Sequence, residues 1–301
     1  MAKKFASVAI VGLPNVGKST LLNALVGEKL AAVSQTPQTT RTKILGVAIL
    51  GDTQLAFLDT PGIHHDGRSL NKRMMGHVEI ALTDADLILW VIDADGFYGP
   101  KERAFAKRLG QARQPVYLLI NKIDLLPKAA LMEKVAAYKD LAPFKEIVPI
   151  AAKQKQNLEP LLEILSKDAP EGDWQYGQDE FTDQTERGLA SEFIREKVLR
   201  KTREEVPHGV AVVISEWIED GENYPEDMDA GGAFIRATIL CDRESHRKIL
   251  LGKGGEMIKD IRQSAQRELK KMLQRQTRLE LHVKVDEGWR DRPSKLDWLR
   301  L

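Results

Sequence analysis

An octapeptide near the N-terminus, Gly12 to Ser19 (GLPNVGKS), constrains the fold of this chain more than any other feature. It follows an apolar, β-branched run at residues 5–11 that is typical of a buried strand, and it precedes a run of helical character at residues 19–26. This strand–loop–helix context favours a phosphate-binding loop, because glycines let backbone N–H groups converge on an anion at a helix start. An ordinary structural turn is the alternative for the octapeptide taken alone.

Two side chains of the loop have specific expected roles. Lys18 supplies a point charge for phosphate, and Ser19 is placed to ligate Mg²⁺. The other loop residues expected to contact a nucleotide are Gly12, Asn15, Val16, Gly17 and Thr20.

A second motif, Asp59-Thr60-Pro61-Gly62, ends another apolar run at residues 55–58. By itself this tetrapeptide signals only a turn. After a phosphate loop, it predicts that the Asp59 carboxylate holds magnesium at the tip of a parallel strand and that the Gly62 N–H senses a γ-phosphate.

A third motif, Asn121-Lys122-Ile123-Asp124, follows a buried-strand run at residues 115–120 and predicts guanine specificity. Guanine presents two adjacent donors, N1–H and the 2-amino group, and the Asp124 carboxylate can accept both, whereas adenine offers no such pair. A site built on this pattern discriminates by about 10⁴ or more. A solvated loop is the alternative for the tetrapeptide alone, but its position as the third motif in order favours a site for GTP or GDP.

The first ~170 residues resemble the translation-factor class of small GTPases. Pro14-Asn15, Gln38 to Arg41 and Asp59 to His64 make the chain similar to the Era family in particular. The resemblance implies a first switch loop at residues 34–42, in which Thr40 ligates magnesium in the GTP state, with Thr39 as the alternative.

The same resemblance implies a base-binding loop at Ala151-Ala152-Lys153, where Ser-Ala-Lys or Ser-Ala-Leu is usual. The Ala152 N–H is expected to donate to the guanine oxygen. The loop lacks the rigidity that a serine hydroxyl would add.

Ile63 stands where many GTPases carry a glutamine that orients the attacking water, and an isoleucine cannot do this. GTPases of this kind resemble one another in an asparagine at the position of Asn15, which implies a potassium ion that stabilises the developing charge. Capping of the loop is the alternative role for Asn15. The expected catalytic residues are Asn15, Lys18, Thr40 and Gly62. His64 and His65 suggest a general base, but no carboxylate is placed by sequence to orient either.

The composition changes after the helical run at residues 157–167. Residues 168–186 are acidic and contain Pro, Gly and aromatic residues, which marks a linker. We therefore predict a GTPase domain at residues 1–170, a linker at 171–186 and a second domain at 187–301.

The second domain has a recognisable order of expected elements: a helix at 188–203, strands at 210–214 and 233–241, a helix ending near Leu250, a basic helix at 256–273 and a strand at 279–285. This order, with Gly252-Lys253-Gly254-Gly255 between the two later helices, resembles a type II KH domain. Ile249 and Leu250 before the loop, and Met257 and Ile258 after it, are expected to be buried. The predicted fold is thus an α/β doubly wound P-loop GTPase domain followed by an α+β type II KH domain.

A lone G-x-x-G is usually a helix cap or a turn, but in this element order it favours close approach of a nucleic-acid backbone. Residues 233–278 carry twelve basic and five acidic residues, whereas the whole chain has a formal charge of only +1. A solvated helix face is the alternative for the more distal basic residues. The expected RNA-binding residues are Gly252, Lys253, Gly254, Gly255, Arg247, Lys248, Lys259 and Arg262.

The resemblance to the Era family extends from about residue 7 to residue 290 and implies a partner. That partner is the 3′ end of 16S rRNA in the 30S subunit, whose maturation the GTPase assists as a monomer with slow intrinsic hydrolysis. Two alternatives stay open: a signalling or scaffold GTPase whose second domain binds protein, and a membrane-peripheral GTPase that uses the basic helix at 256–273.

The single cysteine, Cys241, excludes a disulfide framework and is expected in a core strand. No apolar run approaches the length of a membrane span. Met1 to Lys4 and the following run mimic a signal peptide, but cleavage there would destroy the phosphate loop. We expect a cytoplasmic protein, with peripheral contact at the inner membrane face as an addition.

Overall fold

The structure is a computed structural model that describes residues 2–63, 69–96, 99–219, 224, 225, 228 and 231–301. Contacts divide these residues into two compact units. Unit 1 holds the described residues of 1–31, 40–66 and 71–183, and unit 2 those of 32–39, 67–70 and 184–301.

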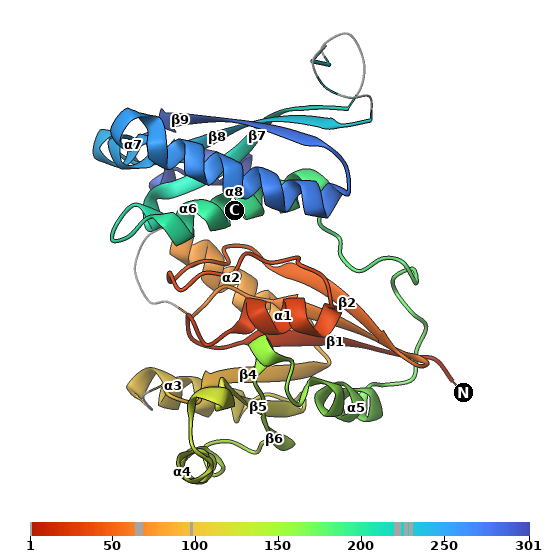
Figure 1. Cartoon of the computed structure of the whole chain (residues 1–301). Helices are drawn as coiled ribbons and strands as arrows, with labels where there is room; N and C mark the ends of the chain where they lie inside the picture. The colour runs from red at the N-terminus through yellow and green to blue at the C-terminus, as the bar shows by residue number, and fades with distance from the viewer. Residues whose placement is uncertain (1, 64–68, 97–98, 220–223, 226–227, 229–230) are drawn as a thin grey trace. The chain divides into compact units, whose positions relative to one another are not determined.

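Unit 1 is built on a six-stranded sheet of order β2-β3-β1-β4-β5-β6 (Figure 1). All neighbouring pairs are parallel except β2 and β3, which are antiparallel. The strands are β1 (Lys4–Val11), β2 (Ile44–Leu50), β3 (Thr53–Asp59), β4 (Leu87–Asp93), β5 (Val116–Asn121) and β6 (Glu146–Pro149).

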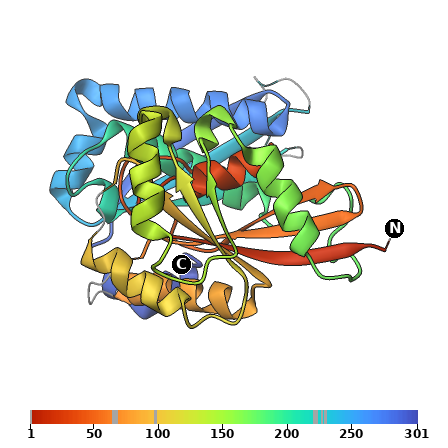
Figure 2. The same ribbon diagram turned by 90° about the horizontal axis from the view of Figure 1, so that it is seen from below.

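Helices cover both faces of this sheet (Figures 1 and 2). They are α1 (Lys18–Val26), α2 (Ser69–Asp84), α3 (Pro100–Leu109), α4 (Lys128–Tyr138) and α5 (Leu158–Asp168), with short 3₁₀ turns η1 (Ile123–Leu125) and η2 (Ala152–Gln154). Because side chains alternate along a strand, β1 contributes to two cores. Val8 and Ile10 pack with α1 and α5, while Ala9 and Val11 pack with α2 and α3.

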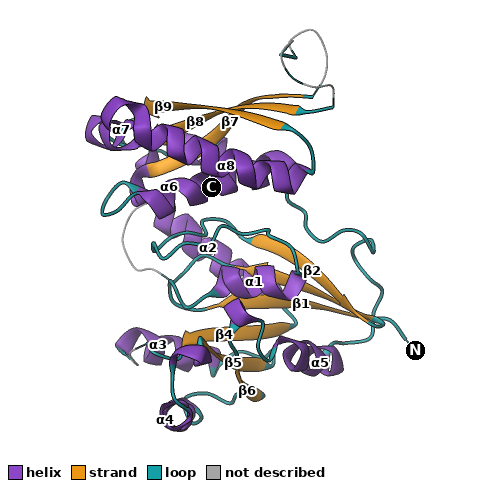
Figure 3. Cartoon of the chain, viewed as in Figure 1, coloured by secondary structure: helices purple, strands orange, loops and turns teal. Residues whose placement is uncertain are grey.

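Unit 2 has a three-stranded sheet of order β7-β8-β9, made of β7 (Val210–Ile218), β8 (Ala233–Cys241) and β9 (Thr277–Val285). β7 and β8 are antiparallel with a bulge between Ile214 and Glu216, and β8 and β9 are parallel. The longer helices are α6 (Glu186–Lys201), α7 (Glu244–Leu251) and α8 (Glu256–Leu273) (Figure 3). A short helix α9 (Pro293–Trp298) and the 3₁₀ turns η3 (Pro207–Gly209), η4 (Lys253–Gly255) and η5 (Trp289–Asp291) complete unit 2.

The core of unit 2 lies between this sheet and the helices α6 and α8. Ile261, Ala265 and Leu269 recur every four residues on α8 and are fully buried. Cys241 is a buried core residue of β8, and burial raises the pKa of its thiol to about 11.

Residues 171–183, which the sequence suggests as part of a linker, lie in unit 1. The Gln54 side chain accepts the N–H groups of Gln175 and Tyr176, both at 3.0 Å, and donates to the Tyr176 carbonyl at 2.8 Å. On β2, the Val47 N–H donates to the Phe181 carbonyl at 2.9 Å. This segment therefore follows the sheet of unit 1.

Among the described residues, no helix combines the length and the apolar character that crossing a membrane requires.

Candidate GTP site and nucleic-acid interface

The phosphate loop connects the end of β1 to the start of α1 in a tightly packed path. Gly12 and Gly17 have φ angles of 154° and 99°. A Cβ at Gly12 would lie 2.3 Å from the Val91 carbonyl oxygen, and one at Gly17 would lie 2.3 Å from Asn121 Nδ2. Both positions thus require glycine for conformation and for space.

Lys18 is the first residue of α1, and its ammonium lies inside the loop. Nζ donates to the carbonyls of Gly12 and Leu13, each at 3.1 Å. Burial lowers the pKa of Lys18 to about 8, although the nearby Asp59 carboxylate opposes this shift. An anion bound in the loop would favour the charged form of Lys18, which burial disfavours.

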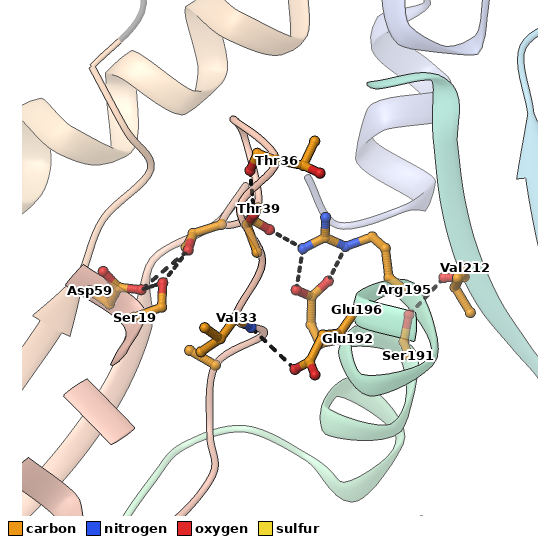
Figure 4. A network of polar contacts seen from close by, with 12 residues as sticks. Ser19, Val33, Thr36, Thr39, Asp59, Ser191, Glu192, Arg195, Glu196 and Val212 are labelled. Atoms are coloured by element: carbon orange, nitrogen blue, oxygen red, sulfur yellow. Dashed lines mark hydrogen bonds and ion pairs between the residues drawn. The ribbon is translucent and has the colours of Figure 1, made fainter. Parts of the chain in front are cut away.

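Ser19 and Asp59 come together (Figure 4), and Thr40 contacts both of them, as the sequence leads one to expect. Ser19 Oγ donates to Asp59 Oδ2 at 2.6 Å and lies 2.7 Å from Thr40 Oγ1, and Thr40 Oγ1 donates to Asp59 Oδ2 at 3.3 Å. Thr39, the alternative ligand, instead donates its hydroxyl to the Thr36 carbonyl at 2.6 Å.

Asp59 is fully buried, and its Oδ1 has no hydrogen-bond partner among the described residues. Burial raises the pKa of this carboxyl, while Lys18, Ser19 and Thr40 oppose the shift. Two hydroxyls and a carboxylate with one unused oxygen are hard ligands of the kind that Mg²⁺ prefers. The residues present therefore fit a magnesium ion.

The segment after Asp59 lies against the phosphate loop. A Cβ at Gly62 would lie 2.8 Å from Pro14 Cγ, and the Ile63 N–H donates to the Gly12 carbonyl at 3.4 Å. The Ile63 side chain is only 6% exposed and packs into the core of unit 1. Ile63 thus has a packing role. His64 and His65 lie outside the described residues.

Asn121 connects the two ends of the candidate nucleotide site. Its Nδ2 donates to the Val16 carbonyl at 2.8 Å, and its Oδ1 accepts the Ala152 N–H at 3.0 Å. The Ala152 N–H, expected to donate to guanine, therefore already donates to Asn121. Lys122, at φ 68°, donates to the Asn15 carbonyl at 2.8 Å.

Asp124 lies on η1, facing the base-binding loop between β6 and α5. Its Oδ2 accepts from Gln154 Nε2 at 2.7 Å, so Gln154 of η2 holds the carboxylate expected to select guanine. Ala151 and Ala152 are buried, whereas Lys153 is exposed.

Sequence reasoning did not identify two contributors to this site. Gln154 carries no motif of its own. Asp93, the ion-pair partner of Lys122, follows an apolar strand run at the carboxyl end of β4, and this position is the signal that would have found it.

The Gly252–Gly255 loop of unit 2 joins α7 to α8, and there is open space around its last two glycines. Gly254 and Gly255 have φ angles of 60° and 82°, and a Cβ at either would meet no atom within 4 Å. Gly252 differs, since its Cβ would lie 2.7 Å from Met257 Cβ. Lys253, which lies between Gly252 and Gly254 in the chain, is exposed.

The other expected RNA-binding residues flank this loop on α7 and α8. Lys248 and Lys259 are exposed, Arg247 pairs with Glu244 at 2.9 Å, and Arg262 contacts Gln266 at 3.5 Å.

One expectation about this hinge is wrong. Ile249 is 49% exposed beside the loop, while Leu250 is buried and Met257 and Ile258 are half-buried. Adjacent residues of a helix point in different directions, so only one of Ile249 and Leu250 faces the core.

Comparison with known proteins identifies both units. Residues 7–122 match the family described as 50S ribosome-binding GTPase, and residues 205–290 match the KH domain. The chain is 41% identical to GTPase Era of Heliobacterium modesticaldum over 289 residues, which cover 96% of this chain and 94% of that protein. It is also 41% identical to GTPase Era of Caldicellulosiruptor saccharolyticus over 292 residues, covering 97% and 95%.

Two solved structures are similar over nearly their whole length. A variant of Aquifex aeolicus Era bound to GDP and AlF₄⁻ has a TM-score of 0.92 at 38% identity and covers 98% of each chain. Era in complex with MgGDPNP and nucleotides 1506–1542 of 16S ribosomal RNA has a TM-score of 0.90 at 38% identity, covering 99% of this chain and 98% of that one.

These similarities confirm the expected fold class, a P-loop GTPase domain followed by a KH domain. With curated relatives 41% identical over nearly its full length, the chain belongs to the GTPase Era family and is a GTP-hydrolysing enzyme.

Proposed function

We propose that this protein is a magnesium-dependent GTP switch that binds the 3′ region of 16S rRNA and acts in maturation of the 30S subunit. The observation that carries the proposal is the Gly252–Gly255 loop, whose last two glycines have positive φ angles and open space. A 38% identical structural relative is bound to nucleotides 1506–1542 of 16S rRNA and to MgGDPNP.

In this proposal, Ser19, Thr40 and Asp59 hold the magnesium ion. The bound ion supplies charge neutralisation at the β- and γ-phosphates. Lys18 exchanges its loop carbonyl partners for phosphate oxygens, and its ammonium form is stabilised by the phosphate charge. In the same proposal, the N–H of Gly62, a residue with little space between it and Pro14, donates to the γ-phosphate.

Guanine selection rests on Asp124. An ionised carboxylate has about four acceptor positions, so Asp124 can accept the two guanine donors while it keeps the contact from Gln154. Asn121 fixes the separation of the base-binding loop from the phosphate loop, because one amide binds both. The Ala152 N–H can be shared between Asn121 and the guanine oxygen as a three-centre hydrogen bond.

We also propose that Asn15 would help hold a potassium ion, which would supply positive charge to stabilise the charge that develops during hydrolysis. Two observations support this proposal. Ile63 faces the core and cannot orient water, and Asn15 has a left-handed φ of 64° at the tip of the phosphate loop.

The test compares kcat in KCl and NaCl at equal ionic strength for the wild type and for Asn15→Ala. We expect stimulation by potassium of about tenfold or more in the wild type and none in the variant, in line with the effect of one charge-stabilising group. Equal kcat in the two salts would exclude the proposal.

The RNA proposal is tested by cross-linking the protein to cellular RNA with a GTP analogue or with GDP and sequencing the bound fragments. Gly254→Asp places a negative charge in the loop, and Gly254→Asn is its neutral control of equal size. Both tolerate a left-handed backbone better than other residues with side chains. We expect a sharp peak in small-subunit rRNA that is lost only in the aspartate variant. Diffuse or variant-insensitive RNA would instead favour a second domain that binds protein.

An anchor on the membrane surface needs a free apolar face. The apolar residues Ile261, Ala265 and Leu269 of α8 are buried in the core of unit 2, so they are not available for such contact. We propose action as a monomer on the ribosomal subunit in the cytoplasm, and the burial of these residues argues against a membrane anchor supplied by this helix.

A further inference from the structure

Residues 32–39, which overlap the expected switch loop at residues 34–42, group with unit 2, although the neighbouring residues on both sides in the chain belong to unit 1. Hydrogen bonds join this short segment to α6, the first helix of unit 2. The next residue in the chain is Thr40, which contacts Ser19 and Asp59.

The contacts on α6 involve backbone groups of the segment (Figure 4). Glu196 Oε2 accepts the Val33 N–H at 3.1 Å, and Arg200 Nε donates to the Val33 carbonyl at 3.0 Å. At the other end, Arg195 donates to the Thr39 carbonyl. Thus side chains of α6 hold both ends of the segment.

A side-chain contact lies between these ends. Thr36 Oγ1 donates to the Leu199 carbonyl at 3.5 Å, at the last full turn of α6. The Thr39 hydroxyl donates within the segment to the Thr36 carbonyl at 2.6 Å, so the turn that ends at Thr39 is itself closed.

Two of the charged side chains that hold the segment, Arg195 and Glu196, are buried, whereas Arg200 is exposed. Arg195 is 2% exposed and Glu196 is 0% exposed. Glu192 binds Arg195, while Lys197 and Arg200 bind Glu196 at 3.2 and 2.9 Å. Arg195 Nη1 has no hydrogen-bond partner among the described residues, so the Thr39 carbonyl is one of the few acceptors that this buried cation has. Burying the charged side chains of Arg195 and Glu196 is costly unless ion-pair partners and backbone groups form hydrogen bonds with them.

From these contacts we infer that α6 is the docking site for residues 32–39 and that docking positions Thr40 as a magnesium ligand. Arg195 and Glu196 are positioning residues in this inference, since they act through the segment and not on the nucleotide. A single peptide bond separates the Thr39 carbonyl held by Arg195 from Thr40.

The inference rests on the proposed magnesium–GTP site. Thr40 is a ligand only in the GTP state, so docking contributes to the affinity for a magnesium–GTP analogue and not to that for GDP. By thermodynamic reciprocity, binding of the analogue then stabilises the segment on α6.

The test uses the full-length chain and compares Arg195→Ala with Arg187→Ala. Both variants remove one arginine from α6, but Arg187 is exposed and is not among the residues that hold the segment. The dissociation constants of GDP and of a magnesium–GTP analogue are measured for each. We expect Arg195→Ala to weaken the analogue about tenfold and GDP less than about twofold, within the usual range of coupling between sites. Arg187→Ala should resemble the wild type.

Two variants keep the test decisive if Arg195→Ala does not fold. Arg195→Lys keeps the charge but loses the planar fork, and Thr36→Val removes the hydroxyl donor from the segment side with little change in shape. Both should weaken the analogue by about two- to fivefold with unchanged melting temperature, as expected for loss of one neutral or partly retained hydrogen bond.

Hydrogen exchange supplies an independent readout. The Val33 amide should exchange more slowly with the analogue than with GDP in the wild type, and this difference should disappear in the Arg195 variants. If the wild type binds the analogue with magnesium but the variants bind it equally well, the inference is overturned while the proposed function stands. If the wild type shows no magnesium-dependent binding, the proposed function fails first.

Discussion

The protein carries two glycine loops that precede helices, one in each unit, and they use glycine for different reasons. In the phosphate loop, a Cβ at Gly12 or Gly17 would meet protein atoms at 2.3 Å. In the Gly252–Gly255 loop, Gly254 and Gly255 have equally unusual φ angles, but a Cβ at either would meet no atom within 4 Å. The first loop is thus confined by the protein, whereas the end of the second is open to a ligand.

The difference shows how tightly each ligand is expected to be enclosed. Asn121 and Val91 fix the phosphate loop from behind, so nucleotide phosphates meet a preformed cradle. The open side of the second loop suits a polymer backbone that passes over it. Substitutions of glycine should therefore have very different consequences in the two loops.

The largest effect is expected for Gly17→Ala. Its Cβ would lie 2.3 Å from Asn121 Nδ2 at a φ of 99°, so both the loop and Asn121 must move. We expect GTP and GDP affinity to fall by more than about 100-fold, since misplaced ligating groups lose much of their binding energy. Gly27→Ala is the matched control, because Gly27 has a φ of 86° and its Cβ would meet nothing within 4 Å. If nucleotide titration gave equal affinities for the two variants, crowding of the Cβ at Gly17 would not be the cause of the loss.

A smaller effect is expected for Gly254→Asp. The added carboxylate faces the open side of the loop and repels phosphate, so we expect affinity for a small-subunit rRNA fragment to fall about 10- to 30-fold at fixed salt. Gly254→Asn should change it by less than about threefold. Fluorescence anisotropy with labelled RNA measures both, and GDP binding should be unaffected in each. Equal losses for the two variants would indicate that shape, and not charge, controls the loop.

The titration of Lys18 predicts two pH effects of opposite sign. Its pKa in the folded protein is lowered from 10.5 to about 8, so between these values the folded state binds fewer protons than the unfolded state. The free energy of unfolding of the nucleotide-free protein should therefore rise with pH across this window.

Nucleotide affinity should fall over the same range, because phosphate requires the ammonium form. We expect a decrease of at most about tenfold between pH 7 and pH 9. Calorimetry in buffers of different ionisation enthalpy should detect proton uptake on GTP binding at pH 9 and little at pH 6. Lys18→Arg is the control, since its guanidinium does not titrate here. Binding without proton uptake would show that Lys18 is already charged at pH 9.

The smallest effect is expected for Gly254→Ala. No clash arises, and only the left-handed φ of 60° costs energy, about 1–2 kcal/mol. We expect a slightly lower melting temperature and RNA affinity within about twofold of the wild type. If RNA affinity fell as far as nucleotide affinity is expected to fall in Gly17→Ala, the open loop would have to become crowded when RNA binds.

The sequence predicted the local elements of both sites well. The strand at 233–241 and the helix at 256–273 have the predicted bounds, because periodicity and glycine stops act over a few residues. Ser19 and Asp59 could be brought together from motifs that follow apolar runs, and Thr40 was added by the resemblance to the Era family.

Other features depend on contacts that no local pattern carries. The contact of Gln154 with Asp124, and that of Arg195 with the Thr39 carbonyl across 156 residues, have no sequence period or motif behind them. The exposure of Ile249 also follows from the direction of α7 relative to the core, which hydrophobicity alone does not give. Whether the predicted domain limits hold as folding units stays a prediction.

The path of residues 171–183 has a practical consequence for dividing the chain. β2 is an outer strand of its sheet, and the Val47 N–H and Leu45 carbonyl that it directs outward are bonded to Phe181 and Thr182. A fragment cut at residue 170 would leave this strand edge uncovered, and uncovered edges recruit strands from other molecules. Aggregation of such a fragment would then reflect where the chain was cut rather than weakness of the GTPase fold, and a cut after Asp183 should avoid it.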